Sequence, residues 1–122
     1  MKIKLEKDFF FEAAHKLPNV PPEHKCARLH GHSYKAQIMI EGEIDPVSGW
    51  FMDHSELSAI AKPIIDGQLD HRYLNDIPGL ENPTFENISQ WLWNRLKPQL
   101  PGLTRITLHE TPTSRCIFEG PR

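Results

Sequence analysis

Two stretches in the first third of the chain place their apolar side chains at every second residue. In the first stretch, the residues that share the odd positions are Ile3, Leu5, Phe9, Phe11 and Ala13. In the second, the residues that share the even positions are Tyr34, Ala36, Ile38 and Ile40. A period of two puts alternate side chains on opposite faces of a β-strand. The chain is therefore expected to build on two half-buried strands that cover one face of a sheet.

The middle of the chain changes to a helical repeat. Residues 52–66 carry apolar side chains three and four positions apart, with Asp53 as the expected N-cap and Glu56 three residues later. Pro63 lies inside this stretch and predicts a kink or a restart of the helix. A second helix is expected to begin at Thr84 and to end at Pro98, with an apolar face formed by Phe85, Ile88, Trp91, Leu92 and Leu96.

The remaining segments complete the expected order ββααββ. Residues 70–83 are expected to form a long loop, whose length indicates a functional segment or an insertion. Closing strands are expected in residues 103–110 and 115–120. This order predicts an α+β fold, with a four-stranded antiparallel sheet and two helices on one face. At 122 residues the chain is expected to be one domain spanning residues 1–122, with the second face of the sheet covered only by assembly.

Charge and composition argue against several classes of partner. The formal net charge of -2 favours neither nucleic acid nor a membrane surface. No apolar run approaches the roughly 18 residues of a membrane helix, and the first ten residues lack the apolar core of a signal peptide. Cys26 and Cys116 are isolated cysteines without a CxxC pair, which fits a reducing compartment. We therefore expect a cytoplasmic protein.

Three histidines continue the apolar rows of the two predicted strands. His15 extends the first row, and His30 and His32 precede Tyr34 in the second. In a strand, H-x-H puts two imidazoles on one face about 7 Å apart at the backbone, a span that a single ion bridges. Three histidine ligands with an open fourth position are typical of catalytic zinc. We therefore expect His15, His30 and His32 to form a zinc site.

Cys26 lies four residues before His30, and two interpretations remain open. It is either a fourth ligand that closes a structural zinc site, or a thiolate base or nucleophile that stands off the metal. The neighbouring cations Lys25 and Arg28 favour the thiolate form. Cys116 lies in the last predicted strand and is assigned to packing.

Three further acidic or basic residues are candidates for the site. Asp70 precedes His71, and a carboxylate beside an imidazole fixes its tautomer and suits a proton relay, provided that the two side chains touch. Glu110 shares the parity of Ile106 and Leu108, so a carboxylate continues an apolar row. It either reaches solvent or binds a ligand, since a buried unpaired carboxylate is costly. Its two oxygens match the N–H edge of a guanine or pterin.

Five motifs spread over essentially the whole chain resemble the 6-pyruvoyltetrahydropterin synthase family. They are "FEAAH" at 11–15, "C-x3-HGHSY" at 26–34, "LDHRYLND" at 69–76, "NPTFENIS" at 82–89 and "HET" at 109–111. The resemblance implies a tunnelling fold whose sheets join into a barrel of several subunits. It also implies a homohexamer with active sites at subunit interfaces.

The same resemblance implies a role for each matched residue. His15, His30 and His32 match the zinc ligands, and Cys26 matches the catalytic cysteine. The relay pair corresponds to Asp70 and His71, and the pterin anchor to Glu110. The remaining matches are substrate-binding: Thr84 and Glu86 support the pterin pocket, and Lys16 lies where a basic residue near the triphosphate is expected.

The spacing C-x3-HGH resembles the carboxy-forming branch of the family. The implied activity is a zinc-dependent carbon–carbon lyase acting on a pterin triphosphate in queuosine precursor biosynthesis. It would convert 7,8-dihydroneopterin triphosphate to 6-carboxy-5,6,7,8-tetrahydropterin, releasing acetaldehyde and triphosphate. The alternatives are a pyruvoyl-forming synthase that eliminates triphosphate without carbon–carbon cleavage, a zinc hydrolase that does not need Cys26, and a non-catalytic zinc-binding oligomer.

Overall fold

The computed structural model describes all 122 residues, and its centre is a long antiparallel hairpin. Strand β1 (Lys2–His15) pairs with β2 (His30–Glu43) along its whole length, so that Lys2 faces Glu43 and His15 faces His30. Strands β4 (Leu103–Thr111) and β5 (Ser114–Phe118) continue the antiparallel sheet beyond β2. The predicted α+β fold with four antiparallel strands is confirmed.

A fifth strand lies at the other edge of the sheet. The short β3 (Arg72–Tyr73) pairs parallel with β1 at Ala13 and Ala14, which gives the strand order β3-β1-β2-β4-β5. It arises within residues 70–83, which were expected to form a long loop. That expectation was wrong, because a 3-10 turn (η3, Leu74–Asp76) follows β3 and its Leu74 is buried in the core.

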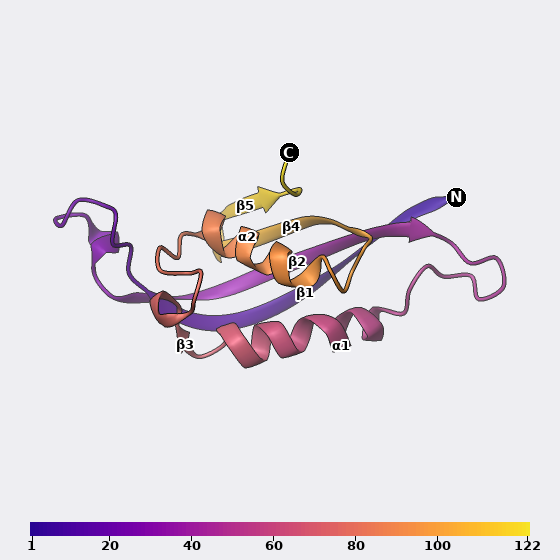
Figure 1. Ribbon diagram of the computed structural model, residues 1–122, viewed down its shortest axis with the longest axis horizontal. Helices are drawn as coiled ribbons and strands as arrows, with labels where there is room; N and C mark the ends of the chain where they lie inside the picture. Colours follow the sequence, from indigo (N-terminus) through magenta and orange to yellow (C-terminus); the bar gives the residue numbers. More distant parts are fainter.

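Both helices pack on one face of the sheet. Helix α1 (His54–Ile64) runs along β1, and α2 (Phe85–Leu96) contacts β4 and β5 (Figure 1). One cluster of 23 buried apolar residues joins the helices to the odd positions of β1 and the even positions of β2, as the alternation predicted. Trp91 and Trp93 belong to this core.

Helix α1 begins where the sequence predicts. The Asp53 side chain caps it by accepting a hydrogen bond from the Ser55 backbone N–H at 3.0 Å. Pro63 does not restart the helix. The helical path continues through it and widens at Ile65 into a π-helical segment (η2, Ile65–Leu69), so the expected interruption takes the form of a change in helical pitch.

The second face of the sheet carries no helix. Its side chains are mostly charged or polar, and Phe10 and Ile117 are exposed among them at 65% and 56% of their surface. Neither helix combines the length and apolar character that a membrane crossing requires. We refer to this side as the open face.

Candidate functional site

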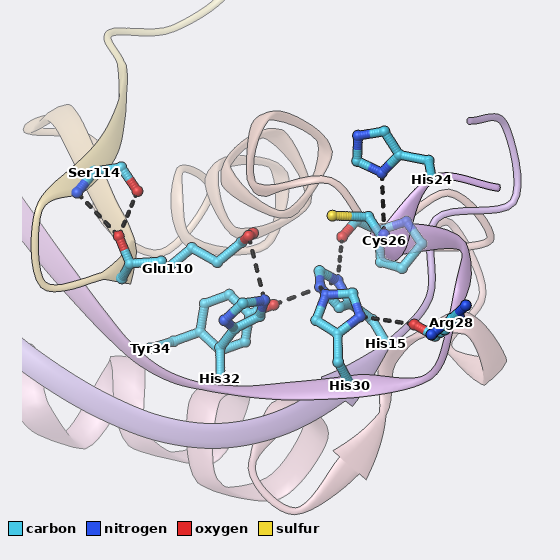
Figure 2. A network of polar contacts seen from close by, with 11 residues as sticks. His15, His24, Cys26, Arg28, His30, His32, Tyr34, Glu110 and Ser114 are labelled. Carbon is cyan, nitrogen blue, oxygen red and sulfur yellow. Dashed lines mark hydrogen bonds and ion pairs between the residues drawn. The ribbon is translucent and has the colours of Figure 1, made fainter. Parts of the chain in front are cut away.

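Three imidazoles converge at one end of the β1–β2 hairpin. The register pairs His15 with His30 and Ala13 with His32, and the alternation directs all three histidines to the face that the helices cover. The centroids of their rings lie 4.6 to 5.1 Å apart, and the three possible ligand atoms lie within 4.8 Å of one another. Figure 2 shows the three rings gathered above β2. The predicted cluster therefore exists within one chain.

Two backbone carbonyls fix the orientation of the first two rings. His15 Nδ1 lies 2.8 Å from the carbonyl oxygen of Pro83, and His30 Nδ1 lies 2.7 Å from that of Arg28. A carbonyl oxygen only accepts hydrogen bonds, so each Nδ1 carries the proton of a neutral ring and each Nε2 presents a lone pair. Metal-binding histidines commonly donate their second N–H in this way.

The lone pairs provide a test of whether the cluster suits a cation. The Nε2 atoms of His15 and His30 are 3.0 Å apart, and two unprotonated nitrogens at that distance repel unless a cation lies between them. His32 Nε2 is buried and makes no hydrogen bond. Burial lowers the pKa of His15 and of His32, which keeps both rings neutral near pH 7. The three residues can therefore hold a metal ion.

Aromatic side chains form the floor beneath this cluster. Tyr34 is 1% exposed, stacks on Phe11 with ring centroids 4.7 Å apart, and meets the rings of His15 and His32 at steep angles. Burial raises the pKa of the Tyr34 hydroxyl, so that it stays neutral. This apolar floor excludes water from one side of the imidazoles.

Glu110 lies at the edge of the cluster. One carboxylate oxygen is 3.3 Å from His32 Nε2, and the side chain is 22% exposed. Burial raises the pKa of Glu110, while His15 and His30 oppose this shift. The register of β4 and β5 is irregular between His109 and Thr111, next to this residue. Glu110 is thus a partly desolvated carboxylate that faces the three histidines.

Cys26 is on the loop between β1 and β2, in a 3-10 turn (η1, Lys25–Ala27). It is free and half-buried, and it does not belong to the group of three mutually close ligand atoms. In Figure 2 its side chain lies on the same side of the sheet as the three imidazoles. Its position thus favours a role beside the histidines over a role as their fourth partner.

Asp70 and His71 touch each other but lie apart from the cluster. Asp70 Oδ2 is 2.9 Å from His71 Nδ1, and Asp70 Oδ1 accepts a hydrogen bond from the Glu12 backbone N–H at 2.8 Å. The His71 side chain is 79% exposed and lines a hollow with Glu12 and Ser33, which point to the open face, and with His32 of the cluster. No hydrogen bond or ion pair joins this pair to Cys26, Glu110 or the three histidines.

The other predicted site residues have defined surroundings. Thr84 caps α2 by accepting a hydrogen bond from the Asn87 backbone N–H at 3.1 Å, and Glu86 is exposed in the first turn of that helix. Glu86 is near enough to raise the pKa of Glu110. Lys16 directly follows His15, and its side chain is exposed.

Several contributors to the site were absent from the sequence prediction. The carbonyls of Arg28 and Pro83 orient imidazoles, but a backbone carbonyl has no side-chain signature. Asn75 binds the backbone of Lys16, and His24 binds that of Cys26. The position of His24 immediately before the turn was the one available signal in the sequence.

Comparison with known proteins gives a consistent result. The family described as 6-pyruvoyl tetrahydropterin synthase matches residues 4–121. The chain is 41% identical over 121 residues to the 6-carboxy-5,6,7,8-tetrahydropterin synthase of Synechocystis sp., covering 95% of this chain and 92% of the relative. It is 38% identical over 116 residues to the dihydroneopterin monophosphate aldolase of Pyrococcus furiosus, covering 90% and 91%.

A solved structure agrees at the level of the fold. The 6-pyruvoyl tetrahydropterin synthase of Caenorhabditis elegans superimposes with a TM-score of 0.91 and 28% identity, covering 99% of this chain and 97% of that one. The coverage extends over both helices and the whole sheet, so the resemblance concerns the complete fold described above.

Proposed function

This chain belongs to the 6-pyruvoyl tetrahydropterin synthase family, and on that premise we propose that it converts 7,8-dihydroneopterin triphosphate to 6-carboxy-5,6,7,8-tetrahydropterin. The reaction would consume one molecule of water, release acetaldehyde and triphosphate, and make the enzyme a carbon–carbon lyase. The observation that supports this proposal best is the group of three imidazoles whose possible ligand atoms lie within 4.8 Å of one another beside Glu110, with a free cysteine nearby. The product would serve queuosine precursor synthesis in the cytoplasm.

Zinc is the ion that we assign to His15, His30 and His32. Imidazole nitrogens suit zinc, and three of them leave a position open for substrate. A zinc ion held there would polarise the side-chain hydroxyls of the substrate as a Lewis acid. His15 and His30 suit this role because the tautomer fixed in each ring leaves Nε2 unprotonated.

The proton transfers are assigned to residues of this chain. Cys26, as a thiolate, would remove a proton from the substrate side chain. His71 would carry protons to and from the reacting carbons, and Asp70 holds its Nδ1 so that Nε2 faces outward. Both bonds that break in the side chain of the substrate, the bond to triphosphate and the carbon–carbon bond, require such proton transfers.

Glu110 is the group that would orient the pterin. Its carboxylate would accept hydrogen bonds from the N–H and NH₂ edge of the ring. Thr84 and Glu86, at the start of α2, would border the same pocket, and Lys16 would meet the triphosphate. The closeness of Glu86 to Glu110 places both carboxylates at one edge of the histidine cluster.

A second copy of the chain would complete the site. Asp70 and His71 lie at the edge of the sheet toward the open face, whereas the three histidines lie on the covered face. The relay pair of one subunit would therefore serve the metal and cysteine of another. We propose a homohexamer, in which each chain is a single domain and the sheets join into a barrel.

The relative from Pyrococcus furiosus supports a second candidate function. At 38% identity, its name indicates carbon–carbon cleavage of a pterin that carries one phosphate. Aldol cleavage of such a side chain leaves the phosphate on the released aldehyde, so it yields no free phosphate. The fate of the phosphate therefore separates the two candidates.

The decisive experiment is a product assay with zinc-loaded protein and 7,8-dihydroneopterin triphosphate. Equal amounts of acetaldehyde and triphosphate are expected. Triphosphate without acetaldehyde would assign the pyruvoyl-forming reaction instead. If the triphosphate is untouched and the monophosphate yields a phosphorylated aldehyde, the chain is an aldolase.

Replacement of Cys26 by alanine tests the role of the thiol. We expect Cys26→Ala to retain one equivalent of zinc, because three imidazoles remain, and to lose turnover, because the group proposed to take the substrate's proton is gone. Metal content and turnover are measured on the same preparation. Loss of zinc from the variant would instead make Cys26 a fourth ligand and favour a closed structural site.

A further inference from the structure

Cys26 lies in a loop that packing alone does not hold. The loop spans residues 16–29 and contains three prolines, and its 3-10 turn at Lys25–Ala27 has no buried residue. A thiol that abstracts a proton must keep its place to within about 0.5 Å. Hydrogen bonds must therefore supply the rigidity that apolar burial supplies elsewhere.

Both polar backbone groups of Cys26 are engaged. Its N–H donates to Nδ1 of His24 at 3.0 Å, and its carbonyl oxygen accepts from the Leu17 N–H at 2.8 Å. The first bond caps the turn that carries the thiol, as Figure 2 shows. The second bond ties the turn to the opposite arm of the loop.

The opposite arm is held in turn by one amide side chain. Asn75 Oδ1 accepts from the Lys16 backbone N–H at 3.0 Å, and Asn75 Nδ2 donates to the Lys16 carbonyl at 2.8 Å. The same Nδ2 lies 3.4 Å from the carbonyl oxygen of Glu81. Because Lys16 adjoins Leu17, these bonds form a continuous path from η3 to Cys26.

We infer that His24 and Asn75 are positioning residues for Cys26, a role that rests on the proposed use of this thiol as a base. His24 fixes the turn from within the loop, and Asn75 fixes the base of the loop from a segment 59 residues away. Neither side chain hydrogen-bonds to the three histidines. His24 acts on the turn that carries the thiol, and Asn75 acts on the loop through the Lys16 backbone, which adjoins His15.

Each side chain suggests a variant that removes only hydrogen bonds made by that side chain. Asn75→Asp keeps the shape and the acceptor but cannot donate to Lys16. His24→Ala removes the cap, whereas His24→Asn restores an acceptor at a position where asparagine caps efficiently. Asn94→Asp and His54→Ala are matched controls, because both residues are exposed and their side chains make no hydrogen bond.

The experiment measures catalysis and thiol geometry separately. Zinc content, kcat and KM are determined for each variant, and the alkylation rate of Cys26 by iodoacetamide is determined in a Cys116→Ser background. We expect His24→Ala and Asn75→Asp to lower kcat about 100-fold with zinc content unchanged, since misplacement by about 1 Å has that effect. KM is expected to stay unchanged in His24→Ala, which leaves the Lys16 backbone held. Alkylation is expected to accelerate severalfold as the half-buried thiol is released, and His24→Asn is expected to restore both values.

The outcomes are distinguishable. Wild-type kcat and alkylation rates in His24→Ala and Asn75→Asp would overturn the inference. So would a loss of zinc or a failure of His24→Asn to restore activity, because either result indicates a general structural defect. If the wild-type protein shows no turnover but the two variants still accelerate alkylation, the proposed reaction fails and the positioning role stands.

Discussion

At the scale of single residues, the histidine cluster is ordered by neighbours that are not ligands. Pro83 and Arg28 contribute only a carbonyl oxygen each, yet those oxygens decide which nitrogen of His15 and His30 faces the centre. Pro83 immediately precedes the cap of α2, so the helix start and the ring orientation are set by the same short segment. A substitution that shifts the backbone near Pro83 would therefore change the orientation of the His15 ring.

The Asp70–His71 pair gives a prediction about acid stability. The Glu12 backbone N–H, and then the His71 imidazole, hold the pKa of Asp70 below its usual range. A carboxyl whose pKa is lowered by folding stabilises the fold fully above its unfolded pKa of about 3.9, and loses that contribution as the pH falls through the lowered value. We expect Asp70→Asn to lower the free energy of unfolding at pH 7, and this difference from wild type to shrink as the pH falls below about 3.9.

Urea unfolding of both proteins at pH 7 and pH 3 measures this difference. Asp66→Asn is the control, since Asp66 is exposed and its side chain makes no hydrogen bond. A gap between Asp70→Asn and wild type that is equally large at both pH values would contradict the ionic explanation.

At the scale of secondary structure, most of the features that the sequence could predict lie in the β1–β2 hairpin. The alternation of Phe9, Phe11 and Ala13 continues to His15, and that of Tyr34 extends back to His32 and His30, because a strand without a bulge preserves parity. Three metal-ligand candidates on one face followed from that rule alone.

The segment between Asp70 and Pro83 could not be predicted in the same way. Its contacts depend on chain partners about 60 residues away, such as Glu12 with Asp70 and Lys16 with Asn75. No local period encodes such a pairing, and two residues of parallel strand are too short for a pattern. The sequence therefore does not predict on which side of the sheet His71 lies.

Helix α2 gives a prediction that separates two roles of Thr84. Its hydroxyl oxygen caps the helix, which leaves the hydroxyl proton free to donate to a substrate. Thr84→Ala is expected to lower the free energy of unfolding by about 1 kcal/mol through loss of the cap. Thr84→Asn preserves a cap and is expected to retain stability while raising KM for the pterin. An unchanged KM in Thr84→Asn would show that Thr84 caps the helix and does not bind the pterin.

At the scale of the whole molecule, the sheet has one covered and one open face. The open face exposes Phe10 and Ile117, and its two outermost strands, β3 and β5, offer unpaired backbone groups at both edges. Edges and apolar side chains of this kind are where chains associate. These features support the proposed assembly and the sharing of sites between subunits.

Mixed assemblies test this sharing. Cys26→Ala and His71→Ala are each expected to be inactive alone. Unfolded together and refolded as mixed oligomers, they are expected to regain about a quarter of the wild-type activity, because one site in four combines two intact halves. Refolding each variant separately before mixing is the control. No recovery in refolded mixtures would place Cys26 and His71 of one site in the same chain.

The separation of Asp70 and His71 from the histidine cluster also has a genetic consequence. Two alleles that each encode an inactive enzyme, one defective on the covered face and the other at the β3 edge, should complement each other in one cell. Two alleles defective on the same face should not. A single defective allele should leave the activity of its normal counterpart undiminished, at half that of two normal alleles, since in the proposed assembly every damaged chain still contributes one intact surface to a neighbour's site.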